Sequence, residues 1–369
     1  MGIEKGKISL WQAILLVSNS ILASMVLITP ALLTKEAGQD AWLSVLIAGV
    51  VGCIIGFLVI SLGLRFPKQN LVEYSIELLG PWFGRAVSII FALFFLHLNA
   101  YLVRAFSVLL ITETMPETPF SVFNILMVIL VVYGVYLGLE VFSRVNEIIF
   151  PLFILAGIII FALAAPEMDF EQLKPYLTHS FPGILWGSLI LASFYAEGAF
   201  VLMLIPSMRN PKEAKKIVVP VTIILLFVIF IDVAGLISLF GAQETARMLF
   251  PTFELAKTVH LGAFLERIES LVVGLWVGSV SLKIMAYYYV SVIIFAEVFN
   301  LKDYRPLVLP YAFILVVLSL TGWTDTNHVR LYLSRYHPLL TITVMVGTTL
   351  LLLIASLFKQ RDTKGGETQ

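Results

Sequence analysis

The chain has 369 residues, of which 59% are hydrophobic and only 13% are charged, and its mean hydropathy is +0.97. Soluble globular domains contain roughly 45–50% apolar and about 25% charged residues, so the composition excludes an ordinary soluble enzyme. The 24 Lys and Arg residues balance 24 Asp and Glu residues. This balance argues against nucleic acid as a partner, because no basic excess remains to neutralise phosphates.

Motifs that would carry catalysis are missing from the sequence. It contains no nucleophile elbow, P-loop, HExxH motif or glycine-rich nucleotide loop. The single cysteine, Cys53, cannot form an intrachain disulfide, and the 5 His residues do not combine with it into a zinc-type cluster. We therefore expect no enzyme activity, no catalytic residues, no metal and no cofactor.

Ten apolar runs dominate the sequence. A membrane-spanning helix needs about 20 mostly apolar residues, and these continuous runs lack the alternation of β-barrel strands. Six runs carry no charged residue: Leu10–Leu33, Ala41–Leu64, Phe120–Leu139, Ile148–Ala165, Leu307–Trp323 and Leu339–Phe358. Four contain one or two ionisable residues: Ala86–Ile111, Phe181–Ser207, Ile217–Phe240 and Ile268–Ala296. The sequence therefore predicts an all-α integral membrane protein with ten transmembrane helices.

Ten crossings place both termini on one side of the membrane, and the Lys and Arg residues of the short loops choose that side. With the N-terminus inside, the inner segments hold 15 such residues and the outer segments hold 6. We therefore expect cytoplasmic N- and C-termini. The first apolar run lacks a small-residue cleavage site, so we expect no cleaved signal peptide.

The loops are too short to contain a soluble domain, so residues 1–369 are expected to form a single transmembrane domain. A division into five plus five spans gives repeat one at about 1–165 and repeat two at about 181–358. Because each half then holds an odd number of spans, the two halves would be inverted relative to one another, a frequent plan among transporters.

Three segments outside the spans have distinct compositions. Pro67–Leu79 is too polar to cross the membrane and is expected to form an interfacial helix. Gly241–Gly262 is mixed and is expected to include a short helix that caps the outer face. The cytoplasmic tail, residues 359–369, is polar and contains glycine, so we expect it to be disordered.

The first span of each half contains small or polar residues near its middle. Ser18–Ser20 and Ala23–Met25 lie in span one, and Tyr195–Gly198 places a carboxylate beside a glycine in span six. Transporter sites often lie where helices break at mid-membrane, so we predict broken helices 1 and 6. Freed amides could hold a carboxylate, and freed carbonyls with Glu197 could hold an ammonium, which suits an amino acid. The alternative is that these small residues serve only helix packing.

Ionisable residues within spans should face a cavity or a partner, because a charge at mid-bilayer costs at least ~2.5–3.5 kcal/mol. Glu197, Lys283 and Arg104 are the deepest, and Asp232 is also deep. Lys283 and Tyr287 are four residues apart and therefore share one helix face. In one interpretation Glu197 and Lys283 border a substrate cavity, with Lys283 in the place of a cation and able to carry a proton. In the other they form a buried pair that fixes helix register.

Five stretches, in order and with matching spacing, resemble one family. They are KEAGQDAWLSVL (Lys35–Leu46), GLEVFSRVNEIIFPLF (Gly138–Phe153), PSMRNPKEAKK (Pro206–Lys216), ERIESLVVGLWVGSVSLKI (Glu266–Ile284) and LKDYRPLVLP (Leu301–Pro310). Over nearly its whole length the chain resembles the B subunits of bacterial spore germinant receptors, the endospore germination permease family of the amino acid–polyamine–organocation superfamily. The resemblance implies the five-plus-five inverted-repeat fold, a site for a small germinant, usually an amino acid, the spore inner membrane, and a complex with receptor A and C subunits.

Carrying the superfamily's site over to this chain implies two sets of residues. The substrate-binding set is Ala23, Ser24, Met25, Tyr195, Ala196, Glu197, Gly198 and Tyr287. The ion- or proton-related set is Lys283, Glu197 and Arg104. The chain departs from the superfamily because Ala23 and Ser24 stand where a glycine is usual, and Gly198 follows the glutamate. Fewer glycines leave the backbone less freedom to unwind.

The sequence hypothesis is a membrane-embedded subunit that recognises a nutrient, with the lipid bilayer around it. One alternative is an autonomous proton-coupled amino-acid transporter, and another is a structural membrane subunit with a vestigial site. The hypothesis depends on Glu197 and Lys283 facing a polar cavity beside unwound turns of spans one and six.

Overall fold

The computed structural model describes residues 6–258, 268–323 and 326–365. Within these ranges the backbone is almost entirely helical, and its β-structure is limited to one isolated bridge between Ile8 and Met208. The Ile8 amide donates to the Ser207 carbonyl at 2.9 Å, and the Arg209 amide donates to the Ile8 carbonyl at 2.9 Å. This bridge ties the segment before the first helix to the segment that follows the sixth crossing.

Within the described residues, ten helical segments are available to cross a membrane. Eight stretches are long and apolar enough by length and composition, the first of which contains both α1 and α2, and α11 is a shorter apolar helix. The segments are α1 (Leu10–Ala37), α2 (Ala41–Arg65), α3 (Leu71–Glu113), α4 (Phe120–Leu137), α5 (Leu139–Ala164), α6 (Phe181–Glu197) with α7 (Val201–Leu204), α8 (Val218–Arg247), α10 (Ile268–Val298), α11 (Arg305–Thr321), and α12 (Thr326–Leu331) with α13 (His337–Thr341) and α14 (Gly347–Gly365). The prediction of a ten-helix membrane protein is confirmed.

Local sequence determines where the first helices begin. Ser9 caps α1 by accepting from the Gln12 amide, and the Gln12 side chain accepts from the Ser9 amide, which forms a capping box. Asn70 and Glu73 form the same reciprocal pair at the start of α3. Both caps satisfy amide groups that the first helical turn leaves without partners.

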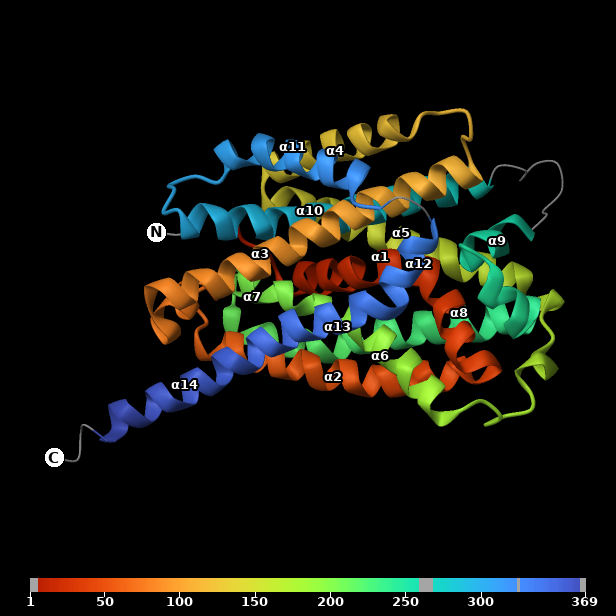
Figure 1. Ribbon diagram of the computed structural model, residues 1–369, viewed down its shortest axis with the longest axis horizontal. Helices are drawn as coiled ribbons and strands as arrows, with labels where there is room; N and C mark the ends of the chain where they lie inside the picture. Colours follow the sequence, from red (N-terminus) through yellow and green to blue (C-terminus); the bar gives the residue numbers. More distant parts are fainter. Residues whose placement is uncertain (1–5, 259–267, 324–325, 366–369) are drawn as a thin grey trace.

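The helix α1 lies at the centre of the bundle and packs against α5, α6, α8 and α10 (Figure 1). Every residue from Gln12 to Thr34 is buried. The outer helices α4, α5 and α11 instead expose large apolar side chains such as Leu126, Ile148 and Phe313, as helices that face lipid should. In addition, α1 packs on α6, α2 on α8, and α3 on α10, so each of the first three crossings contacts the crossing five positions later. The repeat boundaries at 1–165 and 181–358 stay a prediction.

The two predicted helix breaks have different outcomes. The prediction for span one is wrong, since α1 is helical without interruption from Leu10 to Ala37, through Ala23–Met25 and past Pro30. In span six, α6 ends at Glu197 and a 3₁₀ turn, Gly198–Phe200, leads into α7. The sixth crossing therefore changes helix type beside its glutamate, but its backbone does not unwind.

Glycines with positive φ mark the two kinks outside the central helices. Gly80 (φ +81°) separates the first turns of α3 from its membrane-length part, so the expected Pro67–Leu79 helix is present from Leu71. Gly241 (φ +78°) bends the end of α8 in the same way. Residues with a Cβ rarely adopt this conformation, which explains glycine at both points. The expected outer helix is α9 (Pro251–Thr258), and the end of that expected segment lies outside the described residues.

The C-terminal segment differs from expectation in two ways. It contains the apolar run Leu339–Phe358 but is helical from Thr326 onward, and two π-helical turns, Tyr332–Tyr336 and Ile342–Val346, interrupt it. The expectation of a disordered tail at 359–369 is wrong as far as Gly365, where α14 ends after continuing beyond the bundle at the lower left of Figure 1, and 366–369 lie outside the described residues. The Lys359 side chain of α14 donates to the Glu77 carbonyl at 2.9 Å, and this contact joins α14 to the first turns of α3.

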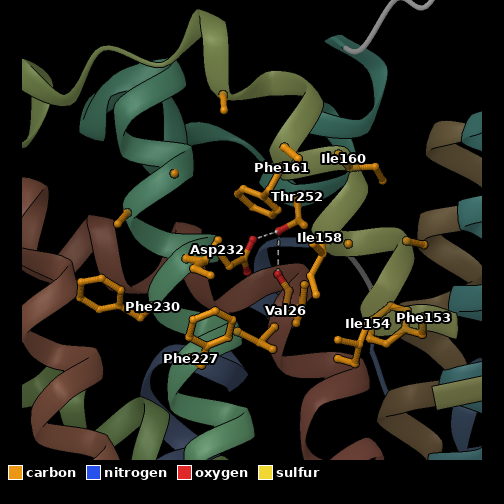
Figure 2. Close-up of a pocket in the computed structure, with 18 of the residues that line it drawn as sticks. Val26, Phe153, Ile154, Ile158, Ile160, Phe161, Phe227, Phe230, Asp232 and Thr252 are labelled. Atoms are coloured by element: carbon orange, nitrogen blue, oxygen red, sulfur yellow. Dashed lines mark hydrogen bonds between the residues drawn. The ribbon is translucent and has the colours of Figure 1, made fainter. Parts of the chain in front are cut away.

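The packing between α5 and α8 leaves a cavity of about 500 Å³ (Figure 2). Its walls are almost wholly apolar, and Asp232 of α8 lies in it. The central cluster described next lies on α1, α6, α10 and α13, and two of these helices, α1 and α10, also contribute Val26 and Trp276 to the cavity wall.

Candidate functional site

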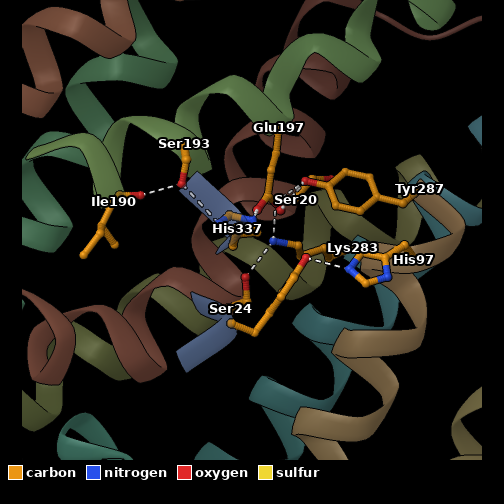
Figure 3. Close-up of polar contacts among 10 residues, drawn as sticks. Ser20, Ser24, His97, Ile190, Ser193, Glu197, Lys283, Tyr287 and His337 are labelled. Carbon is orange, nitrogen blue, oxygen red and sulfur yellow. Dashed lines mark hydrogen bonds and ion pairs between the residues drawn. The ribbon is translucent and has the colours of Figure 1, made fainter. Parts of the chain in front are cut away.

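Glu197 and Lys283 meet at the centre of the bundle. Glu197 is the last residue of α6, Lys283 lies in α10, and Lys283 Nζ is 2.8 Å from Glu197 Oε2 (Figure 3). Both side chains have no accessible surface. The two charged residues, 86 positions apart in the sequence, therefore contact one another directly, as the interpretation of a buried pair requires.

Both charged groups have further polar partners. Lys283 Nζ donates to Ser24 Oγ of α1 at 2.6 Å. The Tyr287 hydroxyl lies 2.8 Å from Glu197 Oε2 and 3.0 Å from the Ser20 carbonyl oxygen. A hydroxyl has one proton, so these two acceptors share a single donor. The cluster therefore joins α1, α6 and α10 through hydrogen bonds as well as through charge.

His337 of α13 contacts the second oxygen of the same carboxylate. Its Nε2 lies 3.0 Å from Glu197 Oε1, and its Nδ1 lies 3.1 Å from Ser193 Oγ. The Ser193 hydroxyl also has the Ile190 carbonyl within 2.6 Å. When that hydroxyl donates to Ile190, both His337 nitrogens must donate and the ring is cationic; when it donates to His337, the ring is neutral. His337 therefore joins α13 to α6 through both of its ring nitrogens.

Three carbonyl groups of α1 accept side-chain donors at three-residue spacing. The Ser20 carbonyl accepts from the Tyr287 hydroxyl at 3.0 Å. The Ala23 carbonyl accepts from Trp276 Nε1 at 2.9 Å, and the Val26 carbonyl accepts from the Thr252 hydroxyl at 2.8 Å. These residues flank Ser24. Side chains of α9 and α10 therefore reach the carbonyls of the stretch where a break was expected, and the helix stays continuous.

The expected polar cavity beside Glu197 and Lys283 is not present in this conformation. A side chain without accessible surface touches no space large enough for a water molecule, and both residues meet that condition. The two charges instead neutralise one another in a closed contact. Breaking such a pair by removing one partner is costly, because a buried charge is left uncompensated. The interpretation as a buried pair thus describes this conformation.

Other residues of the expected site lie near the cluster without joining it. Tyr195 packs against α2, where a Cβ at Gly52 would approach its ring to 2.4 Å. Gly198 packs against α1, 3.2 Å from Ile21 Cδ1 if it carried a Cβ. Ala196 is fully buried in the last turn of α6. These three residues therefore contribute to helix packing.

Met25 and Arg104 are the two remaining residues of the predicted set. The Met25 carbonyl accepts from the Thr29 hydroxyl of its own helix at 2.7 Å. Arg104 lies apart from the cluster, since its guanidinium stacks 3.7 Å from the centroid of the Phe120 ring. Of the predicted set, Ser24, Glu197, Lys283 and Tyr287 make the central contacts.

Sequence reasoning missed His337 and Ser193. His337 precedes Pro338, and both stood outside the last apolar run because that run was taken to begin at Leu339. The available signal was a histidine next to a proline at the edge of an uncharged span, which allows the helix to begin earlier. Ser193 lies four residues before Glu197 on the same helix face, so it was accessible to the same spacing argument.

Comparisons with known proteins give a consistent result. A family described as spore germination protein matches residues 7–327. Spore germination protein YndE of Bacillus subtilis (strain 168) is 26% identical over 349 residues, which cover 92% of this chain and 96% of that protein. Spore germination protein KB of the same organism is 27% identical over 327 residues, 87% of each chain.

Two solved structures share the fold. A Na⁺-coupled sialic acid symporter in a substrate-bound outward-open state aligns with a TM-score of 0.69 and 13% identity, covering 92% of this chain and 79% of the symporter. MhsT in complex with L-phenylalanine aligns with a TM-score of 0.64 and 14% identity, covering 96% of this chain and 99% of MhsT. The predicted transporter-type membrane fold is confirmed.

Proposed function

This chain belongs to the spore germination protein family, and we propose that it is the membrane-embedded subunit that recognises a small germinant, an amino acid, within a spore germinant receptor. We further propose that it resides in the inner membrane of the spore with cytoplasmic termini and acts with receptor A and C subunits. Its relatives are spore germination proteins and its fold is that of small-molecule symporters, which supports this context.

The Glu197–Lys283 pair is the observation that carries the proposal. A zwitterionic amino acid has one ammonium and one carboxylate, the same two charges that the pair places 2.8 Å apart. Inserted between them, the ligand carboxylate would take Lys283 and Ser24, and the ligand ammonium would take Glu197. No charge would then be left without a partner, which is the condition for opening a buried ion pair at modest cost.

The surroundings of the pair provide what such an insertion needs. The Ser20 carbonyl, which now shares the Tyr287 proton, is a further acceptor for an ammonium. The 3₁₀ turn that begins at Gly198 gives the sixth crossing a point at which α6 can move relative to α10. Since α1 is continuous, Lys283 and Ser24 replace the freed backbone amides that the sequence hypothesis assigned to the carboxylate.

A ligand that holds Glu197 and Lys283 apart binds an opened arrangement and not the closed pair. It therefore shifts the population of the two arrangements by its difference in affinity, and a partner subunit can sense that shift. In an autonomous proton-coupled transporter the same opening would be linked to the proton on His337, and that alternative rests on the two hydrogen-bond arrangements of Ser193.

Binding to the purified chain in lipid nanodiscs tests the proposal. Amino acids, nucleosides and sugars are compared, and we expect an amino acid to bind. Glu197→Gln and Lys283→Met should each weaken that binding at least about tenfold, since each removes a charge-assisted contact. Glu140→Gln is the matched control, because Glu140 forms an exposed ion pair with Arg144 far from any ligand contact.

Two outcomes would contradict the proposal. Unchanged amino-acid binding in both central variants would place the ligand elsewhere. Concentrative uptake of the amino acid by the chain alone in proteoliposomes would favour the transporter, whereas binding without flux supports recognition.

A further inference from the structure

Asp232 is a second buried carboxyl group inside the bundle. It lies in α8, is 1% exposed, and belongs to no ion pair among the described residues. Its Oδ2 has no hydrogen-bond partner in that part of the chain. The Thr252 hydroxyl of α9 lies 2.9 Å from Oδ1 and 2.8 Å from the Val26 carbonyl, so one proton serves two acceptors. The hydrogen-bonding capacity of this carboxyl is therefore largely unused.

Asp232 lines the cavity of about 500 Å³ between α5 and α8, with its carboxyl group set into the wall, since the residue is 1% exposed. Asp232 and Thr252 are the polar side chains on its wall, and Figure 2 shows them surrounded by Phe161, Ile158 and Phe227. This volume falls within the range of small-molecule sites, which combine apolar walls with few polar groups. A carboxyl group on an otherwise apolar wall suits a molecule with one polar group and an apolar body.

The cavity opens toward the outside of the bundle. Ile158 of α5 and Phe227 of α8 both line it, and each side chain is more than half exposed. Both helices have membrane length, so their exposed apolar faces lie against lipid. A molecule that partitions into the hydrocarbon can enter sideways, whereas a free polar amino acid cannot.

We propose that this cavity binds an organic amine with an apolar body, its ammonium on Asp232 and its body against the side chains of α5 and α8. The charge of the ligand follows from the carboxyl, because a buried carboxylate without a cation is costly and an ammonium supplies both the charge and the donors. The apolar body follows from the walls. The site is separate from the Glu197 cluster and does not depend on the proposed function.

The same cavity is connected to the central cluster through α1. Trp276 lines the cavity and donates to the Ala23 carbonyl, and Thr252 donates to the Val26 carbonyl. Ser24, which accepts from Lys283, lies between these two carbonyls. An occupant that moves Trp276 or Thr252 therefore acts on the turn of α1 that holds Lys283.

Binding of 4-phenylbutylamine to the full chain in lipid nanodiscs tests the proposal, with empty nanodiscs of the same lipid as the baseline. 4-Phenylbutanol has the same body and a neutral head, and serves as the matched ligand. We expect saturable binding of the amine above the baseline, and binding of the alcohol at least about tenfold weaker. Asp232→Asn should remove the difference between the two ligands, and Ile158→Trp, which adds bulk to the wall on the exposed side of the cavity, should weaken both.

Asp303→Asn is the control variant, because Asp303 is half-exposed beside Arg305 outside the spans. Equal binding of amine and alcohol to the unmodified chain, or amine binding that survives both Asp232→Asn and Ile158→Trp, overturns the proposal. Absence of amine binding above the baseline does the same. If Asp232→Asn fails to fold, the comparison of the two ligands and Ile158→Trp still decide. Amine binding and amino-acid binding are measured separately on the same chain, so failure of this proposal and failure of the amino-acid site are distinguishable.

Discussion

Glu197 and Asp232 are both buried carboxyl groups within the membrane-length helices, yet their surroundings differ. Glu197 has a partner on each oxygen, from Lys283, Tyr287 and His337. Asp232 has one shared donor, Thr252, and an oxygen without a partner beside an apolar cavity. The first carboxylate is neutralised by fixed charges of the protein, whereas the second is neutral or awaits an external cation. Burial alone therefore does not determine how a carboxyl group in a membrane protein is satisfied.

The two regions also differ in how many helices they join. The Glu197 cluster draws on α1, α6, α10 and α13, so its loss disturbs four elements together. The Asp232 contacts join α8 to α9 and, through Thr252, to α1. We therefore expect the free energy of unfolding to depend strongly on the first region and weakly on the second.

Replacing Glu197 by Ala should have the largest effect. It leaves the ammonium of Lys283 buried without an anion, which typically costs about 3–5 kcal/mol. The measurement is the free energy of unfolding of the purified chain in a denaturing detergent. A loss below about 1 kcal/mol would contradict the description of Glu197 and Lys283 as a buried ion pair that neutralises itself.

The double variant Glu197→Gln with Lys283→Met should be less destabilised than the sum of the two single variants. Removing both charges leaves neither one unpaired, and contacting residues couple by roughly 0.5–3 kcal/mol. A double-mutant cycle on unfolding free energies measures that coupling. Pairing either variant with Asp303→Asn supplies the control, because Asp303 lies in an exposed pair with Arg305 and the effects should add within roughly 0.5 kcal/mol.

Thr252→Val should have an intermediate effect of roughly 1–2 kcal/mol. Valine matches the shape of threonine but removes the single donor that Asp232 and the Val26 carbonyl share, which leaves a buried acceptor unsatisfied. The same unfolding measurement applies, with Thr321→Val as a control because the Thr321 hydroxyl bonds only within its own exposed helix turn. Equal effects of the two substitutions would show that Thr252 does not support Asp232.

The sequence predicts the ten crossings because a bilayer demands long apolar runs, and it predicts the deep charges because each is rare in such a run. It does not predict how each charge is satisfied. Asn19 shows why: it exchanges two hydrogen bonds with Ser279 of α10, so the polar residues of span one join helices and do not mark a break. His337 was missed because polar residues precede it, so the last apolar run was taken to begin after it, at Leu339. Arg335, for example, pairs with Glu36 at 3.0 Å, a contact between residues almost 300 positions apart.

Asp232→Asn should have the smallest effect on stability, within about 1 kcal/mol of the unmodified chain. The amide keeps the size of the carboxyl and can donate to Thr252, which then donates to Val26, so every polar group that is satisfied now stays satisfied. Unfolding free energies of Asp232→Asn and Glu197→Gln, measured side by side, sharpen the contrast between the two carboxyl groups. A loss above about 3 kcal/mol at Asp232 would mean that this carboxyl is ionised and held by a cation within the protein, and the two regions would then follow the same rule.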